Sequence, residues 1–180
     1  MSDGLIPRRY AKALFKFSEE TGASSSVYDE MKVVIESFEQ NPDLAKMIAN
    51  PFLPDADKSR LLLAAAGDRL EDLYKGFVRL VINKRRTPWI EQMAYCYRDI
   101  YREKYNISQV CITTAVALPE AEMKRIRGLV EKSFRNTTLE FTEKVDKDII
   151  GGFVIDVDSV RMDASLRNEI ENLRLTLLSK

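Results

Sequence analysis

Histidine is absent from this 180-residue sequence, and cysteine occurs only twice, at Cys96 and Cys111. Histidine is the commonest general base and metal ligand in proteins, so its absence removes many enzyme mechanisms. The two cysteines do not form a CxxC pair, which argues against a zinc site. We interpret both thiols as reduced and buried, which is typical of a cytosolic protein.

The sequence has neither a charge excess nor a long apolar run. Lys and Arg together number 28, as do Asp and Glu, whereas nucleic-acid-binding proteins usually carry a basic excess. No window contains the roughly 20 apolar residues that cross a bilayer. The mixed run after Arg8 and Arg9 is not a secretion signal. We therefore expect neither a general nucleic-acid binder nor an integral membrane protein.

The first part of the chain predicts one helix after another. Apolar residues recur with a period of 3.6, and Gly, Pro and Ser or Thr residues separate the periodic segments. In the last segment Tyr97, Tyr101 and Tyr105 form an i, i+4 stripe that is typical of core or interface packing. The expected helices cover about residues 5–20, 24–40, 44–49, 55–66, 69–83 and 88–105. Short connections between them predict a compact six-helix bundle over residues 1–105.

The character of the sequence changes near Asn106. Residues 107–118 are rich in Val, Ile and Thr and predict a strand. Pro119 then opens a charged helix. Alternating apolar positions and a final amphipathic segment predict three further strands and a helix, at 138–145, 153–157, 160–162 and 164–178. Residues 106–180 are therefore expected to form a small α+β domain.

The helix expected at residues 5–20 carries two apolar stripes. The main stripe consists of Ile6, Tyr10, Ala13, Leu14 and Phe17, which cluster on one face. At 100° per residue Phe15 points about 180° away from Ile6, and Ala11 lies one turn before Phe15 on nearly the same side. The helix at 69–83 has a similarly broad apolar face. Either both helices are central in the bundle, or they leave a groove for a partner helix.

Three motifs could carry chemistry, and each also has a structural explanation. Residues 84–86 are basic and could bind nucleic acid, although cations at the end of a helix also oppose its dipole. Gly151-Gly152 matches no phosphate-loop pattern and more often marks a bulge or a close backbone approach. A carboxylate-dependent hydrolase is conceivable through Asp146, Asp148, Asp156, Asp158 and Asp163. None of the three implies a cofactor or a metal.

The sequence resembles the delta subunit of bacterial and chloroplast ATP synthases, a family that includes the mitochondrial oligomycin-sensitivity-conferring protein. The similar segments are RYAKALF at 9–15, NPFL at 50–53, VINKR at 81–85 and ITTAVAL at 112–118. The most specific similarity is the C-terminal signature, represented here by Val145, Ile150, Gly151, Gly152, Phe153 and Asp163. The family commonly has a basic residue and then glycine near two positions where this chain has Asp156 and Asp158.

The resemblance implies a non-catalytic stator subunit. Its six-helix domain would take an N-terminal helix of an alpha subunit into a groove between the first and fifth helices. Its C-terminal domain would contact the b subunits of the peripheral stalk. On this interpretation the groove is lined by Ala11, Leu14, Phe15, Ser18, Phe77, Val78 and Val81.

Such a subunit would be present once per complex and would lie peripherally on the cytoplasmic face of the bacterial inner membrane. The residues alone leave an alternative open, a cytosolic adaptor or nucleic-acid-binding regulator that uses the basic cluster at 84–86.

Overall fold

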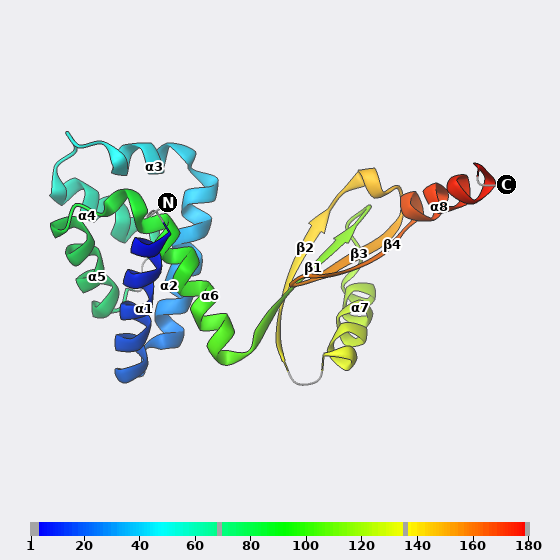
Figure 1. Ribbon diagram of the computed structural model, residues 1–180, viewed down its shortest axis with the longest axis horizontal. Helices are drawn as coiled ribbons and strands as arrows, with labels where there is room; N and C mark the ends of the chain where they lie inside the picture. The colour runs from blue at the N-terminus through cyan, green and yellow to red at the C-terminus, as the bar shows by residue number, and fades with distance from the viewer. Residues whose placement is uncertain (1–3, 68–69, 135–136, 179–180) are drawn as a thin grey trace. The chain divides into compact units, whose positions relative to one another are not determined.

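The computed structural model describes residues 4–67, 70–134 and 137–178, and the chain divides into two compact units, Met1–Lys104 and Tyr105–Lys180 (Figure 1). The first unit is helical. The described part of the second unit is a four-stranded sheet with helices. The prediction of a helical region followed by a small α+β region is confirmed.

Helices in the first unit begin and end close to the positions that the sequence predicts. Their bounds are α1 (Leu5–Glu20), α2 (Ser24–Gln40), α3 (Pro42–Ala49), α4 (Asp55–Ala65), α5 (Asp72–Asn83) and α6 (Ile90–Tyr105). Thr87 and Pro88, expected to open the last helix, form instead a 3-10 turn, η1 (Thr87–Trp89), just before it. The expected start of the fifth helix, Arg69, lies outside the described residues.

Buried tyrosines organise the core of the helical unit. The Tyr74 hydroxyl donates to the Leu62 carbonyl oxygen at 3.0 Å, and the Tyr97 hydroxyl lies 2.8 Å from the Ser18 Oγ. These partners matter because a buried polar group without a hydrogen bond costs free energy. In the predicted tyrosine stripe Tyr97 and Tyr101 are buried, whereas Tyr105 is exposed.

In the second unit the strands are ordered β2-β1-β3-β4. Strands β1 (Ile107–Thr114) and β2 (Thr138–Val145) are parallel and joined by α7 (Glu120–Ser133). Strands β3 (Gly152–Val157) and β4 (Val160–Ser165) form an antiparallel hairpin, and η2 (Lys147–Ile149) and α8 (Leu166–Leu178) complete the unit. The buried core between α7 and the sheet consists of Val110, Ile112, Met123, Val130, Ile155 and Val157.

The first strand is shorter than the predicted segment of 107–118. Thr114 is the last residue of β1 that pairs with β2, opposite Val145. The Thr114 carbonyl oxygen then accepts from the Asp146 N–H at 2.8 Å, and the Thr114 Oγ1 donates to the Val116 carbonyl oxygen at 2.8 Å. The second of these bonds turns the chain out of the sheet, which composition alone did not indicate.

Both cysteines are half-buried, so the prediction that they are buried is wrong. Cys111 alternates with Val110 and Ile112 in β1, so its side chain faces the side of the sheet opposite the α7 core. Cys96 lies on α6 one residue before the buried Tyr97. Burial raises the pKa of the Cys96 thiol, which disfavours its reactive thiolate form.

At the two glycines of the signature the backbone approaches neighbouring groups closely. Gly152 has a φ of +73°, and a Cβ there would lie 2.2 Å from the Ala164 carbonyl oxygen on β4. A Cβ at Gly151 would lie 2.7 Å from the Cδ1 of Leu166, whose N–H donates to the Gly151 carbonyl oxygen at 3.0 Å. The glycine pair therefore lets the start of β3 sit directly against the end of β4 and the start of α8.

Asp163 and Ser165 fix the start of α8. The Asp163 Oδ1 accepts from the Ser165 N–H at 3.0 Å, and the Ser165 Oγ accepts from the Asn168 N–H at 3.2 Å, as an N-cap does. Hydrogen bonds from the Ser165 hydroxyl and N–H hold the pKa of Asp163 below its ordinary value. The described signature residues thus build the junction of the β2–β3 turn, β4 and α8.

The two aspartates that depart from the family pattern have local partners. Asp156 on β3 is paired with Arg161 on β4, with 3.4 Å between the Arg161 Nε and the Asp156 Oδ1. Asp158 has a φ of +48° in the two-residue turn, a conformation that glycine adopts with less strain. Its Oδ1 accepts from the Gln109 N–H at 3.1 Å and its own N–H donates to the Gln109 carbonyl oxygen. These bonds to β1 compensate for the missing glycine.

We predict that Gly152→Ala destabilises the second unit by about 2–4 kcal/mol, because the positive φ and the clash with a backbone oxygen cannot both be relieved. Gly128→Ala in α7 is the control, since a Cβ there meets no atom within 4 Å and alanine is the better helix former by about 1 kcal/mol. Native-state hydrogen exchange of β1 and β3 amides in the full chain measures both effects. Equal stability of the two variants would contradict the packing role of Gly152.

Candidate partner-binding groove

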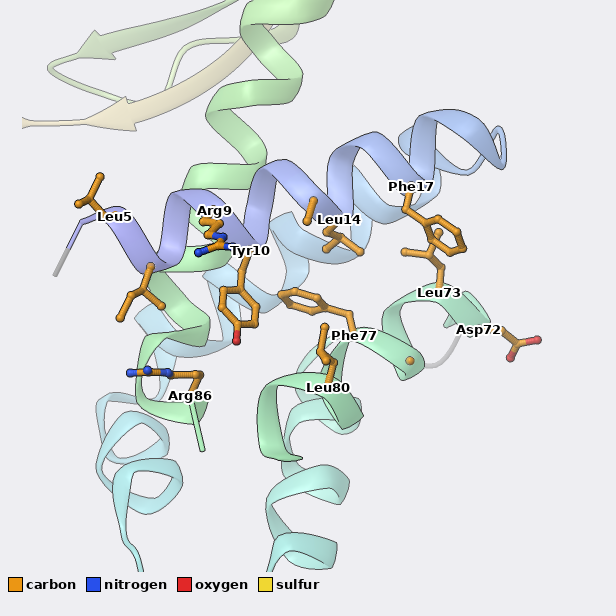
Figure 2. A pocket seen from close by; sticks show the side chains of 13 residues that line it. Leu5, Arg9, Tyr10, Leu14, Phe17, Asp72, Leu73, Phe77, Leu80 and Arg86 are labelled. Carbon is orange, nitrogen blue, oxygen red and sulfur yellow. The ribbon is translucent and has the colours of Figure 1, made fainter. Parts of the chain in front are cut away.

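An apolar groove with a volume of about 780 Å³ lies between α1 and α5 (Figure 2). Residues of α1 that line it are Leu5, Ile6, Arg9, Tyr10, Ala13, Leu14 and Phe17. Residues of α5 that line it are Asp72, Leu73, Gly76, Phe77 and Leu80, and Arg86 follows just after that helix. Along α1 the lining residues span roughly 18 Å at 1.5 Å per residue, the length of about three helical turns.

Large apolar side chains of the groove are open to solvent. Leu5 is 72%, Phe17 57% and Leu80 47% exposed. Contiguous exposed apolar surface on a soluble protein commonly marks an interaction site. The two helices that form the walls are continuous α-helices.

The structure places the main stripe of α1 at this groove. All five of its residues, Ile6, Tyr10, Ala13, Leu14 and Phe17, line the groove. Of the predicted groove residues, Leu14 and Phe77 line it. The other predicted residues have buried side chains that do not line the groove, namely Ala11, Phe15, Ser18, Val78 and Val81.

Contacts with α6 explain why the second stripe of α1 points inward. The Phe15 ring meets Tyr97 edge-on, with 5.8 Å between centroids, and Tyr101 at 6.3 Å. Ser18 Oγ bonds to both the Tyr97 hydroxyl and the Phe15 carbonyl oxygen at 2.8 Å. Edge-on aromatic pairs are favourable beyond their buried area, and the Tyr97 hydroxyl needs a polar neighbour once it is buried. The small side chains of Ala11 and Ser18 leave room for this contact.

On α5 the groove face follows a helical period. Leu73, Gly76 and Leu80 lie at i, i+3 and i+7 and face outward, whereas Tyr74 and Val78 are buried. Gly76 has open space where a Cβ would be. Glycine within a helix costs about 1 kcal/mol relative to alanine, and packing inside the described chain does not require it. Its effect on the groove is to leave the α5 backbone accessible to close approach.

The basic cluster forms the C-terminal cap of α5. The N–H groups of Arg85 and Arg86 donate to the carbonyl oxygens of Ile82 and Val81 at 2.8 and 2.9 Å. Arg85 has a φ of +55°. This pair of bonds around a left-handed residue is the Schellman arrangement that ends helices. The helix-end explanation therefore accounts for the geometry of the cluster, and the turn leaves Arg86 at the groove.

A buried carboxylate holds the other end of α5. Glu30 on α2 is buried, and its Oε1 accepts from the Glu71 N–H, immediately before α5 begins. Its Oε2 has no hydrogen-bond partner within the described ranges. Burial raises the pKa of Glu30, and the charge of Glu71 adds to the rise, while the Glu71 N–H and Lys75 oppose it. The wall of the groove is thus tied to α2 through a group whose ionisation is disfavoured.

The raised pKa makes the contribution of Glu30 to stability depend on pH. Stability from a group with a raised folded-state pKa is fully present below the unfolded pKa, near 4.5 for Glu30, and is lost as pH rises through the folded pKa. We predict that Glu30→Gln, which keeps the acceptor oxygen but cannot ionise, is more stable than the natural chain at pH 8. The difference should shrink towards pH 4.

Urea unfolding followed by the fluorescence of Trp89, the single tryptophan, measures this effect in the helical unit. Glu36→Gln on the exposed face of α2 is the control. A stability difference that is the same at both pH values would show that burial of the charge is not the cause.

A membrane-spanning helix and a metal site each place requirements on the described residues. None of the described helices is long and apolar enough to span a membrane. Among those same residues no group of three or more Cys, Asp and Glu side chains could hold a metal ion. Within the carboxylate-rich segment Asp146 accepts from the Asp148 N–H at 3.0 Å, and Asp156, Asp158 and Asp163 have the local partners described above.

A family model described as the ATP synthase delta (OSCP) subunit matches residues 6–177. The chain belongs to this family. A relative from Phocaeicola vulgatus, described as ATP synthase subunit delta, is 36% identical over 178 residues, which cover 98% of this chain and 96% of the relative. One from Parabacteroides distasonis with the same description is 35% identical, covering 99% and 98%.

Among solved structures, a chain in the cryo-EM structure of the Toxoplasma gondii mitochondrial ATP synthase hexamer has the same fold, with a TM-score of 0.70. It is 17% identical and the match covers 96% of this chain and 97% of that one. The family model and the relatives confirm the predicted family, and with it the prediction of a structural, non-catalytic subunit in the stator of the ATP synthase.

Proposed function

We propose that this chain joins the catalytic head of a proton-translocating F-type ATP synthase to its peripheral stalk. The groove receives an N-terminal helix of an alpha subunit, and the second unit contacts the b subunits. The observation that carries this proposal is the exposed apolar groove between α1 and α5 in a member of this family. On this proposal residues 1–105 act as a six-helix bundle, and one copy binds peripherally at the cytoplasmic face of the bacterial inner membrane.

A stator has to stay bound while the rotor turns through many cycles. Affinity differences between related complexes lie mostly in the rate of dissociation, so a stator interface needs slow release. Exposed ion pairs contribute only about 0–1 kcal/mol each and weaken in salt. Apolar anchors such as Phe17 and Leu80 suit the task better, because each buries a large surface when covered.

The shape of the groove suits a helical occupant. An amphipathic helix binds an apolar groove through its own residues at i, i+3 or i+4, and i+7. Ala13 on one wall and Gly76 on the other are small, so the backbone of a bound helix can come close to both walls.

We predict that Phe17→Asp or Leu80→Asp weakens binding of a peptide with the sequence of the alpha subunit's N-terminal helix by roughly 10- to 100-fold. The reason is the loss of about 1.5–3 kcal/mol of apolar burial at each anchor. The control is Phe52→Asp, the same kind of change at a residue that is 91% exposed and outside the groove. Calorimetry measures the affinity, and Trp89 fluorescence checks that each variant is folded.

Undiminished binding by both groove variants would rule out the groove as the alpha-subunit site. Phe15→Asp does not test it, because Phe15 is buried against Tyr97 and the change would unfold the helical unit.

The surface of α8 supports the contact with the b subunits. None of its described side chains is buried. Leu166, Ile170, Leu173 and Leu177 are exposed and follow a 4-3-4 spacing, which places them on one side of the helix. This is the spacing of a coiled-coil seam, whose partner is another helix. The hydrogen bonds of Asp163, Ser165 and Gly151 fix the start of α8 at the end of β4.

We predict that Leu173→Asp weakens binding to the soluble part of a b subunit by roughly tenfold or more, whereas Leu175→Asp has little effect. The two leucines are 59% and 57% exposed, but Leu175 lies on the opposite side of α8 from the seam. Co-sedimentation or calorimetry with the b fragment compares them. Equal losses would show that α8 binds without a defined seam, or that the contact is elsewhere.

A further inference from the structure

The two ends of the groove differ in charge. Figure 2 shows Arg9 and Arg86 at the end where Leu5 lies, and Asp72 at the opposite end beside Leu73. The walls run in opposite directions along the groove, so their helix dipoles oppose each other at both ends. Side-chain charge therefore decides the electrostatic polarity of the groove.

Arg9 and Arg86 differ from Asp72 in their side-chain partners. Among the described residues neither arginine has an ion pair or a side-chain hydrogen bond. Asp72 differs, since the Lys75 Nζ donates to its Oδ1 at 2.9 Å. A guanidinium carries five donors and binds carboxylate groups in bidentate fashion. Both arginines are exposed and line the groove beside its apolar side chains.

The Schellman turn that ends α5 separates Arg86 from its basic neighbours. Its backbone bond to Val81 holds Arg86 beside the last turn of α5, where it lines the groove. Lys84 and Arg85 are exposed and do not line it. One residue of the basic cluster is therefore available to an occupant of the groove, together with Arg9 from α1.

We propose that Arg9 and Arg86 set the direction in which a helix docks in the groove. The C-terminal end of the bound helix lies at these two residues, and its N-terminal end lies at Asp72. The free carbonyl groups and any acidic side chains of its last turn then face the two guanidinium groups, which is the favourable alignment with a helix dipole. This inference rests on the proposed function, in which the occupant is the N-terminal helix of an alpha subunit.

The direction can be measured with a nitroxide label on either end of the alpha-subunit peptide, bound to the isotope-labelled full chain. A label at the C-terminal end of the peptide should broaden the amide signals around Arg9 and Arg86, and one at the N-terminal end those around Asp72 and Leu73. The reverse pattern would overturn the inference but leave the groove as the binding site. Absence of binding, or broadening away from α1 and α5, would instead overturn the proposed function.

A charge variant tests the cause of the direction. We expect Arg9→Gln/Arg86→Gln to bind the peptide about tenfold more weakly, and with less dependence on salt, because two favourable contacts with the helix end are lost. Lys84→Gln/Arg85→Gln removes the same charge beside the groove and should keep the affinity. Equal loss in the two variants would indicate general attraction to a basic surface and overturn the inference, as would unchanged affinity in the first.

Discussion

The orientation of α1 about its own axis is fixed by buried residues, chief among them Phe15 and Ser18, which contact Tyr97 on α6. Phe15 meets the ring of Tyr97, and Ser18 satisfies its hydroxyl. Because these residues point inward, the opposite stripe of α1 is left uncovered and becomes one wall of the groove. Half a turn of rotation would bury that stripe and expose Phe15. The partner surface is thus a consequence of how the core is packed.

This dependence explains what the sequence could and could not predict. Helices and strands were placed closely because periodicity and the punctuation by Pro and Gly act locally. The sequence could not show which stripe of α1 faces the groove, because both stripes are apolar. The choice between them depends on Tyr97, which is 79 residues from Ser18 in the chain. The resemblance identified the two helices of the groove but carried no information about their rotation. Ser18, a polar residue on an apolar stripe, was the available signal for a buried hydrogen bond.

In the second unit the residues that identify the family have structural roles. Gly152 allows two backbones to approach, and Asp163 and Ser165 begin α8. The available space and the hydrogen-bond geometry limit which residue types fit at these positions. A sequence pattern can therefore identify these residues through their structural role alone. Residues of α8 that face solvent are constrained only through a partner, and their role is recognised from exposure and spacing. How strongly a residue marks the family therefore does not indicate whether it contacts a partner.

Apolar area and charge contribute differently to docking in the groove. Burial of residues such as Phe17 and Leu80 stabilises a docked helix in either direction, because apolar contact does not depend on the sign of a dipole. The charges at the two ends instead affect the difference in binding free energy between the two directions. A reversed helix would present its positive end to Arg9 and Arg86 and its negative end to Asp72. The unfavourable charge contacts of a reversed helix and the favourable charge contacts of a correctly docked helix both increase the difference in affinity between the two directions. Contacts too weak to hold a stator can in this way still determine how it is assembled.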